Sequence, residues 1–137
     1  MSFDLGLYTE GLVTCIGVVV TGDPPANQFR DTRFMAHLAG SSWMMESQWT
    51  AFSSSVEQAA LTNKRGWISL PDTSNMDPAL KTNTEEAINL IWGKLSTLIN
   101  GTPQHAYHPI NMPQTLPDGS MQVDKQNQVS MGGVAFP

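Results

Sequence analysis

The chain has 137 residues, of which 40% are hydrophobic and 14% charged, a composition typical of a folded protein rather than a disordered one. This length fits a single domain over residues 1–137, large enough to bury a core without disulfides or a structural metal. The net charge of −5, with only 7 Lys and Arg residues, argues against binding to nucleic acid or to an anionic membrane surface.

The start of the chain carries acidic residues and glycines where a signal peptide has a basic and then an apolar region, and no apolar run reaches membrane-spanning length. We therefore expect a cytoplasmic location, or export by a route without a signal peptide. Cys15 is the only cysteine, so it fits a reducing compartment or a catalytic thiol. The sequence leaves the oligomeric state open.

Two neighbouring strands are predicted near the N-terminus. Leu12–Val20 is apolar with little alternation, which indicates a strand buried on both faces. A loop is expected over Thr21–Thr32, because its paired prolines cannot continue a ladder. Arg33–Leu38 is predicted to return as the second strand, and an antiparallel return would bring His37 back towards Cys15.

Two helices and several strands are predicted in the rest of the chain. Helical spacing of apolar residues predicts an amphipathic helix over Glu46–Asn63, and Arg65–Pro71 has the composition of a third strand. A second helix is predicted by the apolar face of Thr84–Ile99, with a start as early as Pro78 and an end at Asn100. The remaining residues predict short extended pieces, including a hairpin or two strands near the C-terminus.

This order of elements predicts an α+β fold, in which two main helices pack outside mixed or antiparallel β-sheets. The segment from Trp43 to Met45 leads into the first helix and is either part of the core or an exposed apolar patch for a partner. We expect it to be part of the core, because the helix that follows must be buried.

Cys15 and His37 are the strongest candidates for chemistry. A thiol attacks an amide or ester as its thiolate, and a neighbouring imidazole can accept the proton, so we expect an ion pair that lowers the pKa of Cys15. A third group should hold the other ring nitrogen, and Tyr8, Thr9 and Thr14 lie close in sequence. Two other interpretations stay open: a free cysteine is often a small buried hydrophobe, and a strand histidine is often a hydrogen-bonded core residue.

His105 and His108 invite a comparison with zinc sites, since two histidines three residues apart share one face of a helix. In an extended segment beside Pro109 the two side chains diverge instead. We therefore predict no metal and no other cofactor, and we expect these histidines at the surface or in a supporting role.

The segment Thr9–Val18, followed by Phe34–Leu38, resembles the chemoreceptor glutamine deamidase family (CheD). In that family a T-x-G-x-G-S-C strand is followed by a strand with Met-Ala-His. The segment is also similar to the catalytic domain of cytotoxic necrotizing factor toxins, which share a Cys-His dyad and a sandwich core. The resemblance implies a sandwich-like core here too. Val13 stands where the family pattern has glycine, and Thr14 stands where it has serine.

The resemblance implies a role for each matching residue. Cys15 would be the nucleophile, His37 the base, and the hydroxyl of Thr9 the group that orients the histidine. Backbone N–H groups near the cysteine would bind the oxyanion, with Thr14 and Ile16 as the oxyanion or supporting residues.

The function that these residues predict is that of a cysteine-dependent amidohydrolase, a thiol-dependent enzyme that deamidates glutamine side chains. Its partner would be a protein substrate with an accessible glutamine, and no nucleic acid or membrane is expected as a partner. A thiol protease or a transglutaminase would use the same dyad. The alternative of a different class is a non-catalytic protein-binding module that retains the deamidase-like fold.

Overall fold

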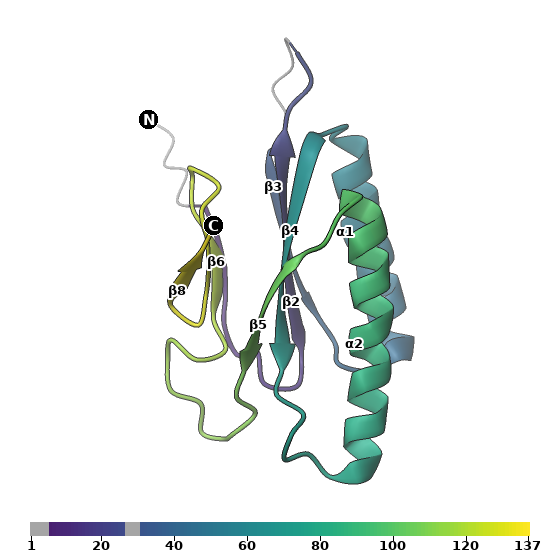
Figure 1. Cartoon of the computed structure of the whole chain (residues 1–137), viewed down its shortest axis with the longest axis vertical. Coiled ribbons are helices and arrows are strands. Elements are labelled where there is room, and N and C mark those ends of the chain that lie inside the picture. Colours follow the sequence, from purple (N-terminus) through teal and green to yellow (C-terminus); the bar gives the residue numbers. More distant parts are fainter. Residues whose placement is uncertain (1–5, 27–30) are drawn as a thin grey trace.

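The computed structural model describes residues 6–26 and 31–137 and has three layers: two helices, a central sheet and an outer sheet (Figure 1). It confirms the predicted α+β fold, with two helices packed outside two four-stranded sheets in a sandwich-like arrangement. In chain order the elements are β1 (Leu7–Thr9), β2 (Ile16–Asp23), β3 (Arg33–Leu38), α1 (Ser42–Gln58), β4 (Thr62–Pro71), α2 (Pro78–Ile99), β5 (Gln104–His108), β6 (Met121–Val123), β7 (Val129–Met131) and β8 (Val134–Phe136).

The central sheet has the strand order β3-β2-β4-β5 and is mixed. β2 runs antiparallel to both of its neighbours, whereas β4 and β5 are parallel. Parallel neighbours need a long crossover connection, and α2 supplies it between these two strands.

β2 is buried along almost its whole length because the central sheet is covered on both faces. Ile16, Val18 and Val20 pack in the core beneath the helices, whereas Val19 belongs to the core between the two sheets. This double cover explains why the strand is continuously apolar instead of alternating.

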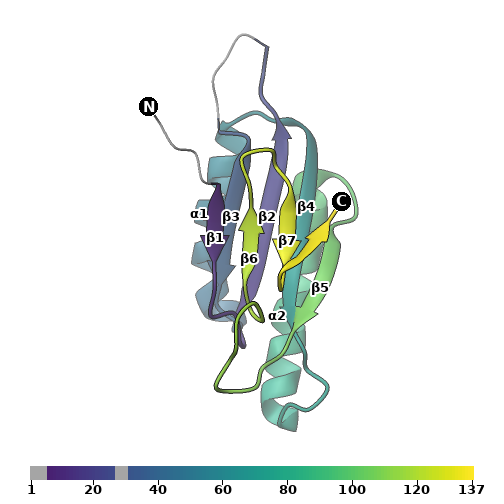
Figure 2. The ribbon, with the colours of Figure 1, turned by 90° about the vertical axis from the view of Figure 1, so that its left-hand side faces the viewer.

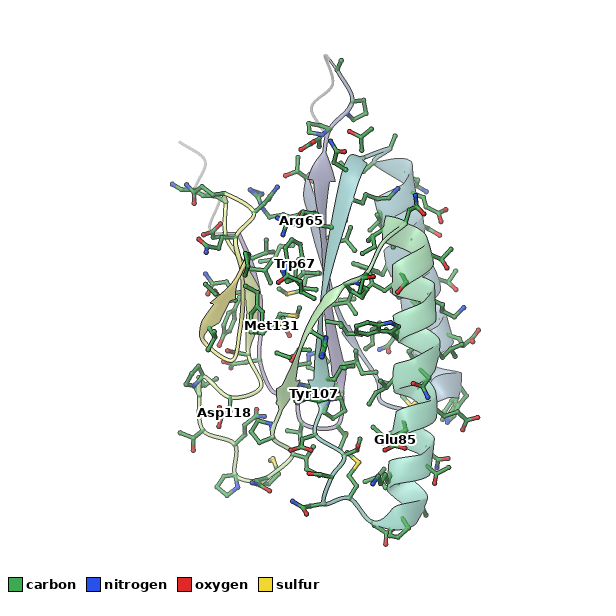
Figure 3. The ribbon with its side chains drawn as sticks, in the orientation of Figure 1. Arg65, Trp67, Glu85, Tyr107, Asp118 and Met131 are labelled. Atoms are coloured by element: carbon green, nitrogen blue, oxygen red, sulfur yellow. The ribbon has the colours of Figure 1, made fainter. Side chains whose placement is uncertain are left out.

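The outer sheet has the order β1-β6-β7-β8, and all of its pairs are antiparallel. It lies over the face of the central sheet opposite the helices (Figure 2). Trp67 of β4 and Met131 of β7 lie in the layer between the two sheets (Figure 3). The buried apolar cluster in this layer consists of Leu12, Val19, Trp67, Met121, Val123, Val129 and Met131.

Several boundaries differ from the sequence predictions. β2 begins at Ile16 rather than at the predicted Leu12, so Cys15 lies in the preceding loop. It continues through Asp23, so the predicted loop begins later than Thr21; residues 27–30 of that loop lie outside the described residues. The first helix lies nearer the N-terminus than predicted and ends at Gln58, because the chain takes positive φ at Ala60 and Asn63 on its way into β4. The second helix begins at Pro78 as predicted.

Two further predictions need correction. β1 was not predicted, and the C-terminal region forms three short strands rather than two. Trp43 and Met44 lie on the surface, with exposed fractions of 79% and 47%, and only Met45 of that triplet is in the core.

In the described part of the chain, neither helix combines the length and apolar character needed to cross a membrane.

Candidate functional site

One edge of the central sheet gathers the residues that could carry chemistry. Because β2 runs antiparallel to β3 and β4, and β5 is parallel to β4, the start of β2 meets the ends of the other three strands. This edge is at the lower end of the sheet in Figures 1 and 2. Cys15 directly precedes β2, His37 lies next to the end of β3, and His108 ends β5. The antiparallel return that the sequence allowed is found between β2 and β3, and it places Cys15, the residue before β2, at the same end of the sheet as His37.

Thr9 and His37 form a hydrogen bond that joins the two sheets. The Thr9 Oγ1 atom lies 3.0 Å from Nδ1 of His37, although the residues are 28 positions apart in sequence. Thr9 ends β1 in the outer sheet, and His37 belongs to β3 in the central sheet. When Nδ1 carries the proton and donates it to Thr9, the lone pair on Nε2 is left to accept a proton.

Cys15 is a half-buried free thiol beside the end of β3. Burial raises the pKa of the Cys15 thiol, and a hydrogen bond from the Gly40 backbone acts in the opposite direction. Burial also lowers the pKa of His37. Both shifts favour the neutral forms, so the expected lowering of the Cys15 pKa by an ion pair is wrong for this arrangement. Within the described residues, no hydrogen bond joins the thiol to the His37 ring.

His108 is a second histidine at this edge; it was expected at the surface or in a supporting role, and it is buried. Its side chain is 3% exposed; Nδ1 lies 2.8 Å from Ser69 Oγ, and Nε2 lies 3.1 Å from the carbonyl oxygen of Val13. A carbonyl can only accept, so Nε2 carries the proton and Nδ1 accepts from the serine hydroxyl. Burial, the largest cause, lowers the pKa of His108 to about 4, so the ring is neutral at neutral pH.

Strand alternation was the only sequence signal that could have separated His108 from His105. In a strand, residues two apart share a face, and Gln104, Ala106 and His108 are the less exposed set in β5. The histidine at the end of that set therefore points into the molecule, whereas His105 is exposed.

The carbonyl groups before Cys15 are held by the surrounding protein. The side chain of Gln114 donates to the carbonyl oxygen of Leu12 at 2.7 Å, and His108 donates to that of Val13. Among residues 6–26 and 31–137, by contrast, no acceptor is found for the backbone N–H of Thr14 or of Cys15.

Thr14 and Ile16 are the two residues predicted to support an oxyanion. Thr14 lies directly beside the cysteine, and its backbone N–H has no acceptor in the described part of the chain. Ile16 is the first residue of β2 and pairs with Leu38, so its backbone already belongs to the sheet. Thr14 is therefore the better placed of the two.

Several hollows among the described residues lie near the helices and could receive a ligand or partner. One of about 370 Å³ adjoins His37 and is lined by residues of β3 and α1. Two others, of about 570 and 630 Å³, lie between α1 and α2 on the outer face and include no residue of the candidate site. The described residues contain no cluster of three His, Cys, Asp or Glu side chains arranged to hold a metal ion.

A scan against protein-family models finds no match for this chain, and a search of the curated proteins finds none either.

Proposed function

We propose that this protein is a cysteine-dependent amidohydrolase that deamidates glutamine side chains in a protein target. The observation that carries the proposal is the hydrogen bond between Thr9 and His37. The residue pattern assigns these two side chains and Cys15 to one site, and the 3.0 Å contact brings two of them together across two sheets. A histidine oriented through one ring nitrogen, at the same end of the sheet as a free thiol, is an arrangement that supports nucleophilic catalysis.

Because the Cys15 thiol and the His37 imidazole are both neutral before reaction, the first step must include a proton transfer between them. His37 Nε2 takes the proton of Cys15 as the sulfur attacks the carboxamide carbon, so charge separates only during the attack. The C–S bond forms while the carbonyl oxygen becomes an oxyanion, which the free N–H groups of Thr14 and Cys15 are available to bind. Catalytic hydrogen bonds are often long in the free enzyme and shorten when substrate binds. The lack of a direct contact between the Cys15 thiol and the His37 ring is therefore compatible with this mechanism.

The second half of the reaction releases glutamate. The histidine gives its proton to the departing nitrogen, the C–N bond breaks, and ammonia leaves a thioester on Cys15. His37 then removes a proton from water, which attacks the thioester carbon and returns the thiol. The hydrogen bond to Thr9 keeps the ring in one tautomer and one orientation through both steps.

A comparison of wild type with Cys15→Ser tests the proposal. The two proteins are incubated with lysate proteins, ammonia release is followed, and mass spectrometry identifies glutamine residues converted to glutamate. We expect conversion at discrete sites with wild type and almost none with the variant, because a serine hydroxyl is a far weaker nucleophile beside a neutral imidazole. If wild type and Cys15→Ser convert glutamine to the same extent at every site, the proposal is wrong.

The surface of α1 favours one alternative, a non-catalytic protein-binding module with the same fold. Trp43 is 79% exposed, an unusual position for the largest apolar side chain, and a hollow beside it also contains Leu90. A binding module has no need for a reactive thiol. An alkylation rate of Cys15 that is negligible up to high pH, together with no conversion of glutamine, would favour this alternative.

A further inference from the structure

The orientation of one peptide bond next to the cysteine follows from His108. The bond between Val13 and Thr14 is trans, so its C=O and N–H groups point in opposite directions. The carbonyl of Val13 points at Nε2 of His108, at 3.1 Å. The N–H of Thr14 must therefore point away from His108, and no described residue accepts a hydrogen bond from it.

His108 is itself held firmly enough to fix that peptide. Its ring accepts from the Ser69 hydroxyl at 2.8 Å, and the two side chains are only 3% and 2% exposed. His108 pairs with Pro71 at the last position of the β4–β5 ladder, so the backbone beneath the ring is also fixed. A buried, fully hydrogen-bonded ring on a strand end has little freedom to move.

Ser69 and His108 resemble a second nucleophile and base, but burial argues against that role. A nucleophilic serine needs contact with substrate, and Ser69 is 2% exposed. Both ring nitrogens of the histidine are already engaged, one by the serine and one by Val13. The pair therefore acts on the loop rather than on a substrate.

We propose that His108 is a positioning residue that fixes the plane of the Val13–Thr14 peptide and thereby presents the Thr14 N–H to the oxyanion formed at Cys15. The inference rests on the proposed function for its reaction class, acyl transfer to sulfur. Donors that are held in place before reaction stabilise an oxyanion most, because no reorganisation is needed when the charge develops. A small tilt of this peptide would misalign the donor.

Two electrophilic reagents that react with the same sulfur separate this role from a structural one. With p-nitrophenyl acetate, sulfur bonds to the acetyl carbon through a tetrahedral oxyanion, and p-nitrophenolate leaves. With iodoacetamide, sulfur displaces iodide and no such oxyanion forms. The chain has one cysteine, so both rates report on Cys15 once the background of Cys15→Ser is subtracted. The ratio of acylation to alkylation therefore measures oxyanion stabilisation.

His108→Phe keeps a ring of similar size but loses both hydrogen bonds. We expect this variant to lower the ratio about 100-fold, the size of effect that misplacement of a catalytic group causes. His108→Gln, whose amide can donate to Val13, should recover part of the ratio. His105→Phe is the matched control on the exposed positions of β5 and should leave the ratio unchanged. Ser69→Ala, which frees Nδ1, should lower it moderately even where His108→Phe fails to fold.

A ratio in His108→Phe equal to that of wild type, or an equal loss of both rates in all folded variants at 108 and 69, would overturn the inference. Neither reagent contains glutamine, so the proposed function is judged separately. If His108→Phe lowers the ratio but wild type converts no glutamine, the positioning role is supported and the deamidase function is wrong. If wild type converts glutamine but His108→Phe leaves the ratio unchanged, the deamidase function is supported and the positioning role is wrong.

Discussion

Gly40 faces the carbonyl oxygen of Thr14 so closely that a β-carbon on Gly40 would overlap it. The end of β3 and the loop that carries Cys15 thus meet at a distance that only glycine allows. The Gly40 backbone also hydrogen-bonds to the thiol. This glycine therefore holds the loop of Cys15 and the strand of His37 together.

Gly40→Ala should displace the cysteine loop and reduce turnover at least about 10-fold, while overpacking costs about 1–3 kcal/mol of unfolding free energy. Turnover and denaturant unfolding measure the two effects. Gly93→Ala is the matched control, since a β-carbon there meets nothing within 4 Å. In mid-helix this change should stabilise the protein by about 0.5–1 kcal/mol and leave turnover unchanged. Equal turnover in the two variants would contradict the role given to Gly40.

Thr9→Val should reduce turnover roughly 10-fold or more, because the His37 ring loses its hydrogen bond while the side chain keeps its shape. The pair lies at the surface, so the unfolding free energy should change by less than about 1 kcal/mol. Thr14→Val is the control, since it changes an exposed hydroxyl but keeps the backbone N–H. Loss of turnover in Thr14→Val alone would mean that the wrong threonine has been placed beside the histidine.

The alkylation of Cys15 should rise with pH and reach half its maximum above the roughly 8.5 of a free thiol. The reason is that burial raises the thiol pKa and lowers that of His37, so neither group is charged at neutral pH. His37→Ala should leave this midpoint nearly unchanged. An ion pair would instead give a midpoint well below that of a free thiol in wild type, and a marked increase of it in His37→Ala.

His108 should make the protein lose stability in mild acid. Its pKa falls from an ordinary 6.5 to about 4 on folding, so the unfolded chain binds a proton between these values and the folded chain does not. The unfolding free energy should therefore fall as pH drops from 6.5 to 4, by up to about 3 kcal/mol from this group. Urea unfolding of wild type and His108→Gln at both pH values measures the difference. An equal acid loss in the two proteins would show that His108 titrates normally.

Residue patterns predicted the parts of this fold that local physics determines. Arg33–Leu38 forms a strand with the predicted bounds, and α2 begins at Pro78 and ends at a left-handed Asn100, where the pyrrolidine ring and the amide side chain favour those positions. The start of α1 and the strand β1 were missed. β1 has three residues and is specified by its pairing with β6, more than 100 positions away in the chain, which no local pattern contains.

The candidate site shows the same division. The antiparallel pair of β2 and β3, which brings His37 back towards Cys15, was predictable from the apolar run and the return strand. The roles proposed for His108, Gly40 and Gln114 depend on contacts between distant segments, such as the 95 positions that separate His108 from Val13. The raised pKa of the Cys15 thiol was also missed. The thiol is partly buried because Cys15 packs against the apolar cluster between the two sheets, and this packing cannot be read from the residues next to it in sequence.

The most direct test of the central claim is to carry out the lysate incubation in water enriched in heavy oxygen. Hydrolysis of a thioester on Cys15 requires each new glutamate to take one oxygen atom from solvent. We expect labelled glutamate at discrete former glutamine sites with wild type, and none above background with Cys15→Ser. If no site acquires the label with wild type beyond the level seen with Cys15→Ser, this protein does not deamidate glutamine through Cys15.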